Sequence, residues 1–406
     1  MRRVVITGMG IYSCIGVTLD EVEASLRAGR SGIGVDPART ACGFRSPLTG
    51  IVKVPDLKDV LERHKRIYLA EQGKYAYVAT KNALADALIS EEYLQGNEVG
   101  VLYGNDSCAD AVIEGYETIK QAGDTQMVGS ASIFRSMNST VSMNLAMIFS
   151  LKGISLTVSA ACASGAHAIG LGAMCIRSGM QDMLICGGAQ EINPFSMSSF
   201  DGLGTFSVRI SDPARASRPF DASRDGLVPS GGAATVILEE YEHAVRRGAK
   251  IYAEIAGYGF SSNGGSISKP CVDGAQASML RALADAGVSS KEIDYINAHA
   301  TSTVLGDAAE AEAIQRIFGP HTVPVSSTKS MTGHECWMAG ASETIYTVLM
   351  MKGGFIAPNI NFEKPDQYTG GLDIVKSPSD AALDVCLSNS FGFGGTNSTL
   401  VVKNIK

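Results

Sequence analysis

One cysteine lies between a strand pattern and a helix pattern. The run 154–158 is apolar and predicts a buried strand, and residues 166–174 predict a helix. Cys162 falls in the turn between them, among small residues that would let a substrate carbonyl approach the backbone. Unpaired N–H groups and the helix dipole favour an anion at a helix N-terminus, so this position predicts a stabilised, nucleophilic thiolate. The alternative is a buried structural cysteine, because free cysteine is among the most buried residue types.

Two histidines follow predicted strands in the second half of the chain. His299 comes after the strand 293–296, and His334 comes after the strand 323–325 and the polar loop 326–333. Ligand and catalytic groups of α/β folds gather at strand ends. Either histidine alone would more often be structural. The remaining histidines lie in helical or charged contexts and are interpreted as structural: His64, His167, His243 and His321.

The elements that must position these residues follow an α/β pattern. Short apolar strands are predicted at 4–7, 99–103, 183–186 and 233–238, and helical spacing at 74–89. The order helix, strand, polar loop occurs twice, beginning with Ala-Leu-Ala-Asp-Ala at 83–87 and again at 282–286. This faint repeat predicts a duplicated α/β unit whose strand ends from both halves meet at one cleft.

Composition narrows the functional classes. The 406 residues are 45% hydrophobic and carry a net charge of −7, which argues against a nucleic-acid partner. No stretch approaches the ~20 apolar residues that span a bilayer, and the N-terminus predicts a first strand instead of a signal peptide. Nine cysteines without a Cys-x-x-Cys pair argue against disulfides and zinc and favour a reducing cytoplasm.

One cysteine and two histidines at three strand ends resemble the β-ketoacyl-acyl-carrier-protein synthases, condensing enzymes with a thiolase-like fold. The resemblance runs from residues 4–10 to residues 388–397 and is closest to the synthase I branch, with synthase II next. The Lys-Ser-Met-Thr-Gly-His motif at 329–334 separates the chain from synthase III, which uses Cys-His-Asn. The resemblance implies a duplicated α-β-α-β-α fold with two mixed five-stranded sheets. Its N-terminal half, 1–250, carries the cysteine, and its C-terminal half, 251–406, carries both histidines.

The implied reaction is a decarboxylative Claisen condensation. An acyl group held on Cys162 is joined to malonyl, and both arrive on the phosphopantetheine of acyl carrier protein. His299 and His334, as neutral donors, would stabilise the enolate oxygen, and the N–H groups of Cys162 and Phe393 would form the oxyanion hole. The family is homodimeric. No cofactor, metal or membrane is implied.

Further site residues are carried over from the resemblance. Lys329, linked to Glu310, would support the catalytic region electrostatically, and Thr301 and Thr303 would bind the pantetheine arm. The Phe393 ring, flanked by glycines, is interpreted as a gate over Cys162, with a fixed core phenylalanine as the alternative. The remaining substrate-binding candidates are Ser107, Phe134, Met137, Phe200, Phe391 and Gly394. Ser107 occupies the position that limits chain length, and its small size predicts that medium or long chains fit.

The chain departs from the family pattern at several positions. Ala300 replaces a glycine after the first histidine, and 335–339, which includes the only tryptophan, Trp337, replaces a small apolar run. Pro-Ser-Gly-Gly at 229–232 replaces a common Gly-Glu-Gly. These differences leave a housekeeping fatty acid synthase and a specialised polyene synthase both open. A non-condensing chain-length-factor subunit, a degradative thiolase and a cysteine hydrolase are the alternative functions.

Overall fold

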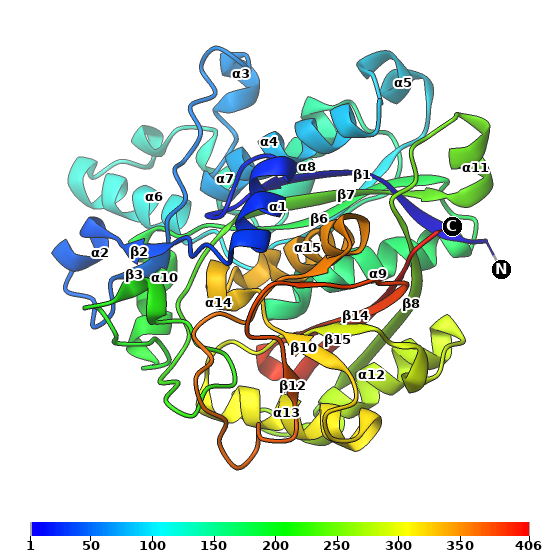
Figure 1. Cartoon of the computed structure of the whole chain (residues 1–406). Helices are drawn as coiled ribbons and strands as arrows, with labels where there is room; N and C mark the ends of the chain where they lie inside the picture. Colours follow the sequence, from blue (N-terminus) through cyan, green and yellow to red (C-terminus); the bar gives the residue numbers. More distant parts are fainter. Residues whose placement is uncertain (1, 406) are drawn as a thin grey trace.

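The computed structural model describes residues 2–405 (Figure 1). Its strands are β1 Val4–Tyr12, β2 Ile33–Val35, β3 Leu48–Gly50, β4 Gly100–Gly104, β5 Ser155–Val158, β6 Met183–Gln190, β7 Gly232–Glu240, β8 Ala253–Ser262, β9 Tyr295–Asn297, β10 Pro324–Ser326, β11 Phe355–Ile356, β12 Asp373–Ile374, β13 Ser379–Asp380, β14 Val385–Phe391 and β15 Thr396–Lys403.

The helices are α1 Leu19–Ala28, α2 Pro37–Ala41, α3 Arg63–Arg66, α4 Glu71–Asp86, α5 Glu91–Gly96, α6 Ala109–Ala122, α7 Ser132–Ser136, α8 Thr140–Ile148, α9 Ser164–Arg177, α10 Pro194–Gly202, α11 Tyr241–Arg246, α12 Val272–Ala286, α13 Val304–Phe318, α14 Lys329–Thr332 and α15 Ala339–Gly353. Short 3₁₀ turns are η1 Thr125–Val128, η2 Ala161–Ala163, η3 Pro213–Arg215, η4 Ser290–Glu292, η5 Cys336–Met338 and η6 Phe393–Gly395.

Helices and sheet form alternating layers. α4 packs on β1 and β7, α12 packs on β8 and β15, and α9 and α15 lie between the two parts of the sheet (Figure 1). The inner helices are buried on nearly all sides, which explains why α15 has thirteen buried residues and no polar face. The predicted α-β-α-β-α layering is therefore confirmed.

The sheet is continuous where two separate sheets were expected. Among residues 2–405, eleven strands join in the order β12-β10-β9-β14-β15-β8-β1-β7-β6-β4-β5. The two parts meet only where β1 and β8 pair, at Val5–Glu254 and Ile6–Ala253. The prediction of two five-stranded sheets is corrected in two respects: this short pairing joins them, and β12 adds a sixth strand to the C-terminal part.

The predicted internal repeat has a physical basis in both halves. Asp86, at the end of α4, accepts a hydrogen bond from the backbone N–H of Met9 in β1, at 2.9 Å. Asp285, its counterpart in α12, accepts one from the N–H of Tyr258 in β8, at 2.8 Å. Each strand bulges at this point and carries glycines against which the helix packs closely. The same helix-to-strand contact is thus built twice, while the domain boundary at residue 250 stays a prediction.

One strand is less buried than its sequence predicted. β5 precedes Cys162 and lies at the edge of the sheet, paired only with β4. Leu156 in this strand is 53% exposed. An apolar run of this kind is common to a central strand and to an edge strand that another surface covers, and periodicity does not separate the two.

Candidate active site

Cys162 sits in a tight turn at the start of α9. Ala161, directly before it, has a φ of 46°, which is unusual for a residue with a side chain. The turn is held by the Ala161 N–H, which donates to Asp106 at 2.9 Å, and by the Ser164 hydroxyl, which donates to the Ala161 carbonyl at 2.6 Å. These contacts place the cysteine at the strand-to-helix turn that the sequence predicted.

The thiol of Cys162 is buried, with 5% of the residue exposed. Burial raises its pKa to about 12, while the charge of Lys329 and the N–H groups of Phe393 and Cys162 act in the opposite direction. The expected stabilised thiolate is therefore not the resting form: desolvation outweighs the nearby positive charge and N–H groups. The proton must leave the sulfur as the acyl group arrives.

The loop before β15 brings a second N–H group to the sulfur. The Phe393 N–H forms a hydrogen bond with the Cys162 thiol, which lowers the pKa of that thiol. Gly392, directly before Phe393, lies close to the backbone of Cys162. A Cβ at Gly392 would lie 2.9 Å from the Ala160 carbonyl and 3.2 Å from the Cys162 nitrogen, so the approach requires glycine. The Phe393 ring is 38% exposed and stacks on Phe200, with ring centroids 6.2 Å apart.

The two predicted histidines lie together. Their ring centroids are 5.3 Å apart and the rings are nearly perpendicular, at 88°. Burial lowers the pKa of both His299 and His334 well below the ordinary value, and the charge of Lys329 lowers both further. Among residues 2–405, His299 Nδ1 and both ring nitrogens of His334 are buried without a hydrogen-bond partner. Two neutral imidazoles therefore keep polar atoms available for a bound molecule.

Backbone contacts fix both histidines. His334 is held by its N–H, which donates to the Val228 carbonyl at 2.7 Å, and by its carbonyl, which accepts from the Ser230 N–H at 2.8 Å. The divergent segment 229–232 therefore supports the second histidine. Glu310 accepts hydrogen bonds from the N–H groups of His299 and Ala300, at 2.9 and 2.7 Å. Ala300 fits this turn without a positive φ, so a glycine is not required there.

The predicted partner of Lys329 is corrected. Its ammonium group binds Glu343 on α15, not Glu310, and both side chains are almost completely buried. Burial raises the pKa of Glu343 to about 8, against the opposing effect of Lys329. Glu310 instead accepts from Asn389 at 2.9 Å, besides the two N–H groups of the histidine loop. The Lys–Glu pair thus links α14 to α15 and leaves Glu310 as a support for His299.

A cavity of about 330 Å³ joins these groups. Nine of the predicted site residues line it: Cys162, Phe200, His299, Thr301, Thr303, Glu310, His334, Phe391 and Phe393. Lys329, Ser107, Phe134, Met137 and Gly394 are not among its lining residues. Phe134 and Met137 are each 43% exposed on the surface, and Ser107 is covered by Trp337, whose indole N–H donates to its hydroxyl at 3.2 Å.

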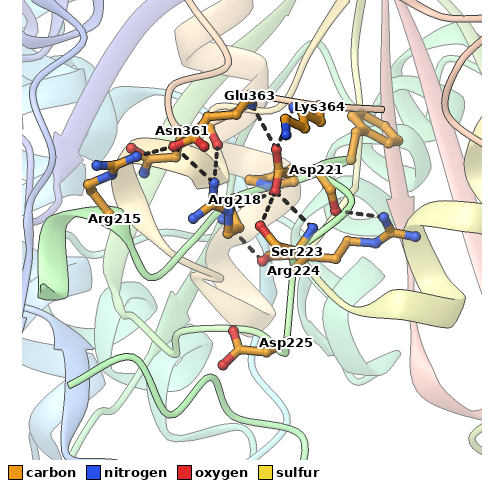
Figure 2. Close-up of polar contacts among 12 residues, drawn as sticks. Arg215, Arg218, Asp221, Ser223, Arg224, Asp225, Asn361, Glu363 and Lys364 are labelled. Carbon is orange, nitrogen blue, oxygen red and sulfur yellow. Dashed lines mark hydrogen bonds and ion pairs between the residues drawn. The ribbon is translucent and has the colours of Figure 1, made fainter. Parts of the chain in front are cut away.

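The loop that carries Thr301 and Thr303, called the threonine loop, is held by a charged network that the sequence analysis missed. Asp221 accepts hydrogen bonds from Arg218, from Ser223 and from the backbone N–H groups of Glu363 and Lys364 (Figure 2). Arg224 donates to the carbonyls of Thr303 and Val304, at 3.2 and 2.9 Å, and to Asp366 at 2.7 Å. The signal was the alternation of Arg and Asp in residues 218–225, a segment with neither strand nor helix periodicity.

One cluster of acidic residues away from the cavity has carboxylate oxygens close enough together to hold a metal ion. Within residues 2–405 it consists of Glu71, Asp110 and Glu191. The carboxylates of Glu71 and Glu191 already accept backbone N–H groups, from Ile192 at 2.9 Å and from Ala109 at 2.7 Å. These contacts account for Glu71 and Glu191 as structural groups. Within the same residues, no helix is both long enough and apolar enough to span a bilayer.

Comparisons with known proteins cover the whole chain. The model of the N-terminal domain of β-ketoacyl synthase matches residues 1–244, and that of the C-terminal domain matches residues 252–363. The 3-oxoacyl-[acyl-carrier-protein] synthase 1 of Escherichia coli is 42% identical, with 100% of both chains covered.

Solved structures agree with these matches. A β-ketoacyl synthase from Burkholderia phymatum superposes with a TM-score of 0.95 and 37% identity, over 100% of both chains. A ketosynthase solved in complex with its type II polyketide acyl-carrier protein superposes with a TM-score of 0.90 and 30% identity, also over 100% of both chains.

Proposed function

The chain belongs to the β-ketoacyl synthase family, and we propose that it elongates fatty acyl or related polyene chains by two carbons. The activity is that of an acyl-transferring condensing enzyme, a 3-oxoacyl-[acyl-carrier-protein] synthase. The observation that carries the assignment of residues is the cavity lined by Cys162, His299 and His334, with unpartnered imidazole nitrogens inside it.

In the first half-reaction Cys162 takes the acyl group. Its sulfur attacks the acyl thioester, a new S–C bond forms, and the carrier thiol leaves with the proton that Cys162 gives up. The N–H groups of Cys162 and Phe393 stabilise the oxyanion of the tetrahedral intermediate. Because burial keeps the resting thiol protonated, this proton transfer is part of the step.

In the second half-reaction malonyl loses CO2. The electrons of the broken C–C bond form an enolate, whose oxygen accepts hydrogen bonds from the neutral imidazoles of His299 and His334. The enolate carbon attacks the thioester on Cys162, a C–C bond forms, and the sulfur leaves as a thiolate that takes up a proton from solvent water. Lys329, which is hydrogen-bonded to Glu343, holds positive charge near the developing negative charge and does not line the cavity.

The partner that we propose is acyl carrier protein, whose phosphopantetheine arm enters along Thr301 and Thr303. Their hydroxyls lie 3.1 Å apart at the cavity wall. A thiol nucleophile and hydrogen-bond donors supply the chemistry, so we expect no resident cofactor or metal.

We further propose a homodimer. The open edge of β5 exposes Leu156, and the region of α6 and α7 exposes further large apolar side chains: Val112, Tyr116, Met127, Ile133, Phe134 and Met137. Exposed apolar side chains and an unpaired strand edge are both typical of a subunit interface.

Two measurements with purified carrier proteins test the function. Mass spectrometry should place the acyl group on Cys162, and malonyl carrier protein should then release CO2 and yield a 3-oxoacyl product. A chain-length factor or a cysteine hydrolase would give no condensation product. A thiolase would prefer coenzyme A thioesters and would need a second cysteine near the C-terminal glycine motif. The cysteine nearest to that motif in the sequence, Cys386, is buried within β14, outside the cavity.

A further inference from the structure

The only tryptophan of the chain lies beside the nucleophile. Trp337 is 6% exposed and packs in one apolar cluster with Cys162, Cys336 and Phe200. Its ring centroid is 6.1 Å from that of Phe200, which itself stacks on Phe393. The indole therefore lies directly behind the part of the cavity wall that Cys162 and Phe200 form.

Hydrogen bonds hold the indole in a single orientation. The Trp337 N–H donates to the Ser107 hydroxyl, and that hydroxyl donates to Glu191, both at 3.2 Å. Glu191 is anchored in turn by the N–H of Ala109 and the amide of Asn193. A rotation of the indole would leave the Ser107 hydroxyl without its donor and the Trp337 N–H unpaired in an apolar cluster.

The backbone of Trp337 is also confined. A Cβ at Gly188 in β6 would lie 2.5 Å from the Trp337 carbonyl oxygen, so η5 lies directly against the sheet. The cavity reaches Cys162 and Phe200 but is not lined by Trp337 or Ser107. The space that the small Ser107 side chain leaves is thus occupied by the indole.

We propose that Trp337 determines acyl-chain length in this enzyme: its indole, held by Ser107, closes the pocket beside Cys162 and excludes longer chains. The proposal rests on the proposed condensing function. It replaces the sequence-based expectation that a small Ser107 admits medium or long chains. One methylene in an apolar pocket changes specificity by about 10–200-fold, so a closed wall produces a sharp upper limit.

The first test measures acylation of Cys162 across a panel of acyl carrier proteins, from butyryl to palmitoyl, by single-turnover mass spectrometry. Trp337→Ala should move the upper limit to longer chains, with a gain of about tenfold or more on the first chain that the parent excludes. Trp337→Phe, which keeps a ring, should shift the limit less. Leu280→Ala, an exposed truncation on α12, should leave the profile unchanged.

The second test uses the parent enzyme alone. Because Trp337 is the only tryptophan, its fluorescence reports directly on this wall. Emission should stay constant with the shortest acyl groups and change once the chain is long enough to touch the indole. This readout keeps the proposal testable even where Trp337→Ala does not fold.

Two results would overturn the proposal. One is an equal loss of rate by folded Trp337→Ala with every chain length, and the other is emission that responds to no acyl group. Failure of the proposed function is distinguishable, because the parent enzyme would then acquire no acyl group on Cys162 at all.

Discussion

At Cys162, burial and positive charge act on the same proton in opposite directions. Burial is the larger effect, and it raises the pKa of the thiol to about 12. Lys329 and two backbone N–H groups reduce this shift without reversing it. The same buried, cationic surroundings keep both histidines neutral, and a neutral imidazole still has one N–H to donate to an enolate.

The pH dependence of alkylation tests the state of Cys162. Below its pKa, each pH unit raises the thiolate fraction tenfold, so the iodoacetamide rate should climb steadily to at least about pH 10. Lys329→Met removes a charge that lowers the pKa and should move the profile to higher pH. The double variant with Glu343→Gln controls for the carboxylate left unpaired. A plateau near pH 7 would instead support the thiolate expected from the helix N-terminus.

The two histidines should affect one half-reaction. His299→Ala and His334→Ala should each retain much of the acylation of Cys162, while malonyl decarboxylation falls by about 10²–10³-fold, the usual cost of one such donor. Radiolabelled CO2 release and acyl transfer are measured on the same preparation. Normal decarboxylation with failed acylation would contradict the assigned roles.

Among the elements, the loop before β15 combines a tight backbone turn with a partly exposed ring. Gly392 allows the backbone to approach Cys162, while the Phe393 side chain points to a partly open surface. With 38% exposure, Phe393 is not a core residue. The geometry therefore favours the gate over the fixed-core alternative.

Phe393→Ala should leave the fold nearly as stable as the parent, well short of the ~3–5 kcal/mol lost on truncating a core phenylalanine. Discrimination between acyl and malonyl carriers in the first step should weaken. Thermal melting and a two-substrate competition assay measure both, with Phe393→Leu as a control that keeps bulk. A large drop in melting temperature with unchanged substrate order would exclude the gate.

Arg224 connects the threonine loop to the loop that carries Asp366. Substitution of Arg224 should therefore change substrate binding. Lysine cannot reproduce the several directed N–H contacts of the guanidinium group, so Arg224→Lys should raise KM for acyl carrier protein about tenfold. Acylation of Cys162 by a small acyl thioester should change much less. Arg215→Lys, in the exposed part of the same network, is the matched control and should have little effect. Equal effects of both variants would exclude a positioning role.

For the whole molecule, the open side of β5 predicts assembly. Light scattering should give twice the chain mass of 42.5 kDa, and Leu156→Asp should shift the protein toward monomer. Val245→Asp, equally exposed but on α11, should not. A monomeric parent at micromolar concentration would contradict the homodimer.

The sequence by itself determined structural features that are encoded within a few positions or that occur twice along the chain. Cys162 lies at a strand-to-helix turn, and both histidines follow strands, because apolar periodicity and turn residues are encoded within a few positions. The repeat at 83–87 and 282–286 was visible because Asp86 and Asp285 bind their strands in the same way. The family motifs then connected these separate elements.

Tertiary structure alone decided the contacts between distant segments. Lys329 binds Glu343 on α15 and not Glu310, a choice between two carboxylates that spacing along the chain does not make. Ser107 and Trp337 are 230 positions apart, so their hydrogen bond has no local signal. Burial likewise fixes the protonation of Cys162, because desolvation depends on the whole surrounding core and not on the neighbours of the residue in the chain.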